Sequence, residues 1–115
     1  EIASCLVGSE MCIRDSYKRV LEWCEEKQYS LCVVLPFIST EQALNRQLLN
    51  LRQEAEHICG GKAFLLDLQP AIGMDAGARF KAYVDGIHPK SQTYEAMGSY
   101  AAPLIWKWLK NEKEA

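Results

Sequence analysis

The chain has 115 residues, with 13 Lys and Arg against 15 Asp and Glu, so its formal net charge is -2. That length allows one domain at most, and the near-neutral charge gives no electrostatic case for binding nucleic acid or an anionic membrane. The five cysteines have no paired spacing, which argues against a disulfide framework or a zinc ribbon, and no apolar run approaches the roughly 20 residues of a membrane span.

Residues 1–16 have neither a helical nor a strand period, and we expect them to be unstructured and without function. The string CLVGSEMCIRDS, from Cys5 to Ser16, resembles the translated read-through of a sequencing adapter at the end of a reading frame assembled from environmental DNA. Such segments are excluded from fold reasoning. The expected domain is therefore 17–115, and a genuine but disordered N-terminus is the alternative.

The first half of this domain predicts a helix, a strand and a second helix. Residues 17–28 read as a short helix, and the apolar run 31–35 reads as a strand covered on both faces, which Pro36 ends. Ser39 followed by Gln42 is a capping-box pattern, so a helix is expected to begin there and to end at Gly60-Gly61. Its apolar stripe would be formed by Leu44, Leu48, Leu51, Ala55 and Ile58.

The second half predicts one more strand, a long connection and a last helix. Residues 63–68 form the strand, and 69–90 form a loop rich in Gly and Pro, of a length that is usually functional. Ser91 would cap the last helix, which Pro103 is expected to kink or split because proline removes a backbone donor. The buried stripe of this helix would be formed by Tyr94, Met97, Ala101, Leu104 and Trp108.

Strands that alternate with helices indicate an α/β domain with a parallel sheet and right-handed crossovers. Two strands alone do not make a stable sheet, and an all-apolar strand needs neighbouring strands and helices on both faces. We therefore expect the C-terminal part of a three-layer α/β/α sandwich whose earlier βα units lie outside this sequence.

One short motif carries the clearest chemistry. Asp85-Gly86-Ile87-His88-Pro89 lies at the end of the long loop, where ligands of parallel α/β folds bind. An Asp three residues before a His can fold back in a turn, which the glycine permits, and accept a hydrogen bond from Nδ1 of the imidazole. That contact fixes the tautomer and leaves Nε2 as a general base. By residue type alone, a helix-entry turn with a solvated His is the favoured interpretation, because a lone Asp-x-x-His is common.

The motif, followed by Tyr94 and Met97, resembles the last conserved block of the SGNH (GDSL-like) hydrolases, a flavodoxin-like family. The resemblance covers 17–115, about the second half of such a domain. It implies an esterase or acylhydrolase in which His88 is the catalytic base of a Ser-His-Asp triad and Asp85 is its partner. Lys90 and Thr93 depart from the family's usual residues at their positions.

The resemblance has no counterpart for the nucleophilic Ser or the oxyanion Gly and Asn, so we expect the chain as printed to be inactive. Arg14-Asp15-Ser16 only superficially looks like a nucleophile block, because it lacks the Gly and follows no strand. Ser39 and Ser91 are better explained as helix caps. His57 and Cys59 point to different faces of their helix and would not share a metal, and Asp67 is expected to bind loop backbone.

The implied substrate is a small ester, such as an acetylated sugar, a lipid or another acyl ester, and no metal or organic cofactor is required. Two alternatives stay open. A non-catalytic flavodoxin-like or receiver-like binding module shares the layout, and a short protein could complete its sheet by pairing the edge of 31–35 with a partner. The compartment, the oligomeric state and the particular ester do not follow from the sequence.

Overall fold

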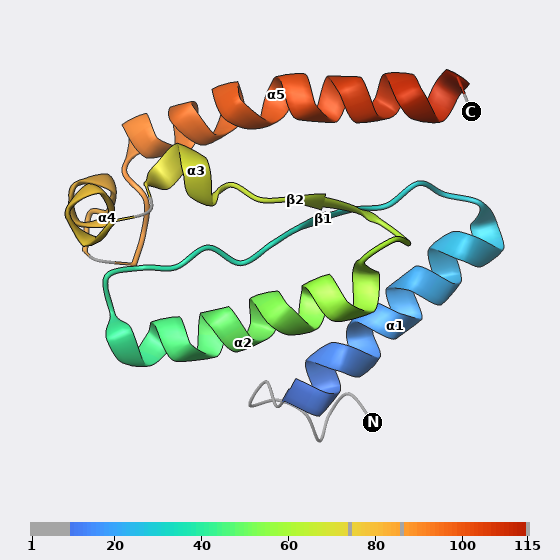
Figure 1. Ribbon diagram of the computed structural model, residues 1–115, viewed down its shortest axis with the longest axis horizontal. Coiled ribbons are helices and arrows are strands. Elements are labelled where there is room, and N and C mark those ends of the chain that lie inside the picture. Colours follow the sequence, from blue (N-terminus) through green and yellow to red (C-terminus); the bar gives the residue numbers. More distant parts are fainter. Residues whose placement is uncertain (1–9, 74, 86, 115) are drawn as a thin grey trace.

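The computed structural model of the chain describes residues 10–73, 75–85 and 87–114. Those residues form a mixed α/β structure that is mostly helical (Figure 1). The elements in chain order are α1 (Glu10–Lys27), β1 (Cys32–Val34), α2 (Gln42–Cys59), β2 (Phe64–Leu66), α3 (Gln69–Ile72), α4 (Ala76–Ala82) and α5 (Ser91–Glu114).

The two strands pair in parallel, with Cys32 opposite Phe64 and Val34 opposite Leu66. Helix α2 makes the connection between them, as the alternation of apolar strands and an amphipathic helix predicts. Each strand is shorter than its apolar run, because only three residues of each are paired. The parallel pair is confirmed, and it brings the carboxyl ends of both strands to one side, where α3 and α4 lie (Figure 1).

Helices cover both faces of this small sheet, as Figure 1 shows. On one face Val33 packs with Ile58 and Cys59 of α2, and residues of α1 complete that cluster. On the other face Leu66 packs with Met97 and Ala101 of α5. Alternate residues of a strand point to opposite faces, so the continuous apolar runs are explained by this double coverage.

Helix α1 begins earlier than the sequence predicts. We expected residues 1–16 to lack structure, but residues 10–16 belong to the helix, while residues 1–9 lie outside the described part. The Arg14 guanidinium forms two hydrogen bonds with the carboxylate of Glu54 in α2, over 3.0 and 2.8 Å. This ion pair holds the first turns of α1 against α2, a long-range contact that no periodicity within 1–16 reveals.

The start of α2 also differs from the capping-box prediction. The helix begins at Gln42 with Glu41 as its N-cap, and the side chain of Glu41 makes no capping hydrogen bond. Ser39 is buried, and its hydroxyl accepts the backbone N–H of Glu41 over 3.0 Å and donates to Asn45 over 3.1 Å. Ser39 therefore stabilises the loop before the helix. The predicted stop is confirmed, since α2 ends at Cys59 and Gly61 adopts a φ of 78°.

The long connection 69–90 contains two helices that the sequence analysis missed. Pro70 lies in the first turn of α3, where its missing N–H costs no helical hydrogen bond. Asp75 caps α4 by accepting the backbone N–H of Ala78 over 2.9 Å. Both helices are too short to show a hydrophobic period, so their Gly and Pro residues were interpreted as loop.

The sequence predicts that Pro103 kinks or splits the last helix, and α5 runs through Pro103 as a single helix, so it is not split. Met97 and Ala101 are buried before the proline, and Trp108 stacks on Phe64 after it, with ring centroids 5.1 Å apart. Packing on both sides of the proline offsets the one hydrogen bond that it removes. Two members of the predicted stripe, Tyr94 and Leu104, are exposed instead.

Candidate functional site

The segment that carries Asp85 and His88 folds back on itself between α4 and α5. Tyr83 and Pro89 form an antiparallel bridge at its base. The backbone N–H of Val84 donates to the carbonyl of His88 over 2.7 Å, and that of Lys90 donates to the carbonyl of Ala82 over 2.9 Å. Residues 82–85 and 87–90 therefore form a loop that backbone hydrogen bonds close at its base. The loop lies on the side of the sheet where both strands end, and Gly86 lies outside the described residues.

Within this loop the structure brings Asp85 and His88 together. Oδ2 of Asp85 lies 2.6 Å from Nδ1 of His88. The other oxygen, Oδ1, accepts the backbone N–H groups of Ile87 over 3.0 Å and of His88 over 2.8 Å. The two backbone contacts form the turn that folds the carboxylate toward the imidazole, which is the local geometry that the spacing of the motif predicts.

The hydrogen bonds also set the charge of Asp85. The backbone N–H of His88 holds the pKa of this carboxyl well below its usual range, and the His88 side chain and the Ile87 N–H act in the same direction. Asp85 is therefore ionised at neutral pH and can only accept hydrogen bonds, so Nδ1 of His88 is the donor. In the neutral imidazole this leaves Nε2 as an acceptor of protons.

Both side chains lie open to solvent. The side chain of His88 is 73% exposed and that of Asp85 is 52% exposed. The hydrogen bonds of His88 within the described part of the chain go to Asp85 and Val84. The imidazole of His88 is thus oriented by Asp85 and is otherwise largely open to solvent.

The other serines considered from the sequence are accounted for in different ways. The Ser39 hydroxyl is used by Asn45 and by the N–H of Glu41. Ser91 is the first residue of α5. Ser16 lies in α1 next to Asp15, and Arg14 is committed to Glu54, so this triplet does not form a strand-end nucleophile motif.

Asp67 behaves as predicted at the end of β2. It accepts the backbone N–H of Gln69 over 3.0 Å, and Arg52 of α2 binds both of its oxygens, over 3.0 and 2.6 Å. The Arg52 hydrogen bond lowers the pKa of Asp67, although partial burial opposes this shift. The residue fixes the chain after the strand and is not available to a ligand through a free carboxylate.

The two residues considered for metal binding, His57 and Cys59, have different surroundings. His57 is exposed, whereas Cys59 is 1% exposed and belongs to the core cluster beside β1. Burial raises the pKa of the Cys59 thiol, which makes a thiolate ligand less accessible. Among the described residues there is no group of three or more His, Cys, Asp or Glu that could hold a metal ion.

Two residues that support the segment were not identified from the sequence. The phenol of Tyr83 donates to the carbonyl of Ile38 over 2.5 Å, and the hydroxyl of Thr93 donates to the carbonyl of Ala82 over 2.7 Å. The sequence offered only a lone aromatic residue two positions before Asp85 and a Thr two positions after the expected start of the last helix. Neither belongs to a periodic pattern.

A groove of about 410 Å³ lies at the opposite end of the strands from this segment. Its walls come from the residues that precede each strand and from the end of α5: Tyr29, Ser30, Leu31, Gly61, Lys62, Ala63, Phe64, Trp108 and Glu112. The carboxyl ends of parallel strands are the usual ligand side of such folds, so we do not connect this groove with Asp85 and His88.

Comparison with known proteins adds no further constraint. No protein family, curated protein or solved structure matches this chain. In the part of the chain that the structure describes, no helix is both long enough and apolar enough to cross a bilayer.

Proposed function

We propose that this chain is part of an ester hydrolase of the SGNH type, which works through a serine acyl-enzyme. The observation that carries the proposal is the contact of 2.6 Å between Oδ2 of Asp85 and Nδ1 of His88. An ionised carboxylate that is held by two backbone N–H groups fixes the imidazole in the tautomer that a general base requires.

In this mechanism His88 is the base and Asp85 orients it. A serine hydroxyl attacks the carbonyl carbon of an ester, and Nε2 of His88 takes its proton as the bond forms. The imidazolium then gives that proton to the departing alcohol, and a water molecule, activated in the same way, releases the acid. Donors around the developing oxyanion lower the barrier of both steps, and the reaction needs no metal or organic cofactor.

We infer that the nucleophile and the oxyanion donors belong to a preceding part of a longer protein. Their motifs have no counterpart in 17–115, and the exposure of His88 and Asp85 leaves room for further elements around them. The proposed complete fold is a three-layer α/β/α sandwich. Its support is the parallel pair β1–β2 with helices on both faces, together with Val34, which is 50% exposed in the middle of an apolar run.

The non-catalytic alternative has weaker support. A receiver-like module needs acidic side chains at the end of an early strand, which the proposed complete fold places before residue 17. Among the described residues, the carboxylate that follows β2 is Asp67, and Arg52 binds both of its oxygens. The arrangement of Asp85 and His88 would have no role in such a module.

The test is to recover the longer protein by a genomic read through the codon for Tyr17 and to measure its hydrolysis of p-nitrophenyl acetate. We expect activity that His88→Ala lowers by about 10³-fold or more, since this is the effect of removing a triad base. The matched control is His57→Ala, which changes the exposed His of α2 and should leave the rate unchanged.

The 115-residue chain itself is expected to be inactive in the same assay and to take no label from a fluorophosphonate, which reacts with activated serines. Hydrolysis by this chain that disappears in His88→Ala would contradict the proposal that the nucleophile lies in a preceding part of a longer protein. A read that reproduces residues 1–16 after a genuine start signal would remove the triad assignment.

A further inference from the structure

Two buried hydroxyl groups anchor the base of the segment that carries Asp85 and His88. Thr93, in the first turn of α5, is 8% exposed and donates to the carbonyl of Ala82 over 2.7 Å. The same carbonyl accepts the backbone N–H of Lys90 over 2.9 Å. Thr93 therefore joins the end of α4 to the start of α5 at the point where the segment departs and returns.

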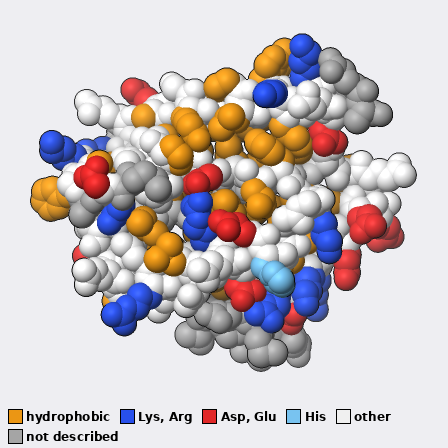
Figure 2. Space-filling model, viewed as in Figure 1, with side chains coloured by type: hydrophobic (Ala, Val, Ile, Leu, Met, Phe, Trp, Pro, Cys, Tyr) orange, Lys and Arg blue, Asp and Glu red, His pale blue; other side chains and the backbone are white. Residues whose placement is uncertain are grey.

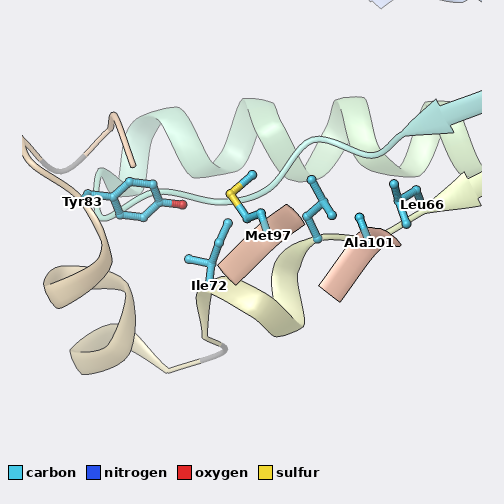
Figure 3. Close-up of a cluster of buried hydrophobic side chains, with 6 residues drawn as sticks. Leu66, Ile72, Tyr83, Met97 and Ala101 are labelled. Carbon is cyan, nitrogen blue, oxygen red and sulfur yellow. The ribbon is translucent and has the colours of Figure 1, made fainter. Parts of the chain in front are cut away.

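The second anchor is Tyr83, which is 3% exposed. Its ring lies in the core cluster with Ile72 and Met97 (Figure 3), and its hydroxyl donates to the carbonyl of Ile38 over 2.5 Å. The N–H of Ile38 in turn donates to the side chain of Gln69 over 2.9 Å. The loop after β1 is thus held from two sides, and Tyr83 attaches the base of the segment to it.

We propose that Thr93 and Tyr83 are positioning residues for the Asp85–His88 pair. The pair itself is largely exposed, and a contact between two exposed side chains three residues apart is weakened because solvent screens it and the side chains keep their rotamer freedom. The bonds of Asp85 to the N–H groups of Ile87 and His88 shape the turn, while the bridge between Tyr83 and Pro89 and the Ala82 carbonyl attach that turn to the rest of the fold. The catalytic role of this positioning rests on the proposed function, whereas the positioning itself is independent of that function.

The test follows the tautomer of His88 through the ¹⁵N shifts of its two ring nitrogens in the 115-residue chain, with His57→Gln used to assign the signals. Thr93→Val and Tyr83→Phe each remove one hydroxyl with little change of shape. We expect each to lower the ratio of the Nδ1-protonated to the Nε2-protonated tautomer about fivefold, the factor that corresponds to one lost hydrogen bond. Thr93→Ser keeps the hydroxyl and should retain the original ratio.

A matched control separates positioning from general loss of stability. Ile58→Val lies in the cluster on the other face of the sheet and lowers stability without contacting the segment, so it should leave the tautomer ratio unchanged. An equal change in Ile58→Val would overturn the inference, as would an unchanged ratio in Thr93→Val and Tyr83→Phe. Absence of a preference for the Nδ1-protonated tautomer in the unsubstituted chain would overturn it too. None of these outcomes depends on hydrolytic activity, so failure of the proposed function is detected separately.

Discussion

The two carboxylate oxygens of Asp85 bind different partners, and this arrangement predicts how Asp85→Asn changes the tautomer of His88. Oδ1 holds the turn through the N–H groups of Ile87 and His88, while Oδ2 meets the imidazole. In Asp85→Asn one of these positions becomes an NH₂ group. If the amide oxygen keeps the turn, its NH₂ group faces Nδ1, which must then accept, so the proton moves to Nε2.

We therefore expect Asp85→Asn to switch the tautomer of His88, visible in the ¹⁵N shifts of both ring nitrogens in the 115-residue chain. In the longer protein the same substitution should lower kcat by about 10³- to 10⁴-fold, because the wrong tautomer cannot act as base. Unchanged ring shifts in Asp85→Asn would show that the carboxylate does not set the tautomer.

The second prediction at this scale concerns Asp67 and acid. Its pKa in the folded chain is lowered by the Arg52 hydrogen bond. Its contribution to stability is therefore complete above the ordinary Asp pKa of about 3.9 and is lost as the pH falls from there through the lower, folded value.

Urea unfolding between pH 6 and pH 2.5 measures this loss. We expect the free energy of unfolding to fall less steeply with acid in Asp67→Asn than in the unsubstituted chain. Asp15→Asn, which changes an exposed carboxylate of α1, is the control and should keep the original slope. Parallel curves for Asp67→Asn and the unsubstituted chain would contradict the assignment.

Among the elements, α5 offers the clearest test, because it continues through a proline inside the helix. Pro103 is exposed and cannot donate to the carbonyl of Ser99. We expect Pro103→Ala to restore that hydrogen bond and to raise the free energy of unfolding by about 1–3 kcal/mol. Ala102→Gly, at an exposed neighbouring position, should lower it by about 1 kcal/mol. A Tm that does not rise in Pro103→Ala would mean that the proline is accommodated without cost.

The elements that could be predicted from the sequence are those with a long hydrophobic pattern. The parallel strands and the stop of α2 at Gly60 follow from apolar runs and a helix-ending glycine. The first turns of α1 depend instead on Arg14 reaching Glu54, forty residues away. Helices α3 and α4 are too short for a period, and Ser39 is used by a loop network rather than a cap.

The candidate site likewise contains one contact that could be predicted from the sequence and two that could not. The contact between Asp85 and His88 is local, so the spacing of the motif was sufficient to predict it. Its anchors at Tyr83 and Thr93 bind carbonyl groups at Ile38 and Ala82. Such contacts with backbone atoms depend on the tertiary fold and leave no pattern in the sequence.

At the scale of the whole molecule, the most consequential feature is the second edge of β1, with which no strand of the described residues pairs. The carbonyl of Leu31 and the N–H of Leu35 bond to β2, so the backbone groups of the alternate residues, Cys32 and Val34, point to the other side. Figure 2 shows further hydrophobic side chains on the surface, along α5 and across the middle of the face that is drawn there. An apolar edge of this kind pairs readily with another chain.

We therefore expect the 115-residue chain to self-associate as its concentration rises, measured by sedimentation velocity. Val34→Lys places a charge on the edge and should weaken association about tenfold, the factor that corresponds to the burial of one valine. Val20→Lys is the matched control, because Val20 is 45% exposed on α1 against 50% for Val34. Equal weakening by both substitutions would point to general hydrophobic contact, and a monomer at every concentration would show that the edge is already protected. Association that only Val34→Lys weakens would identify β1 as the place where the sheet is completed.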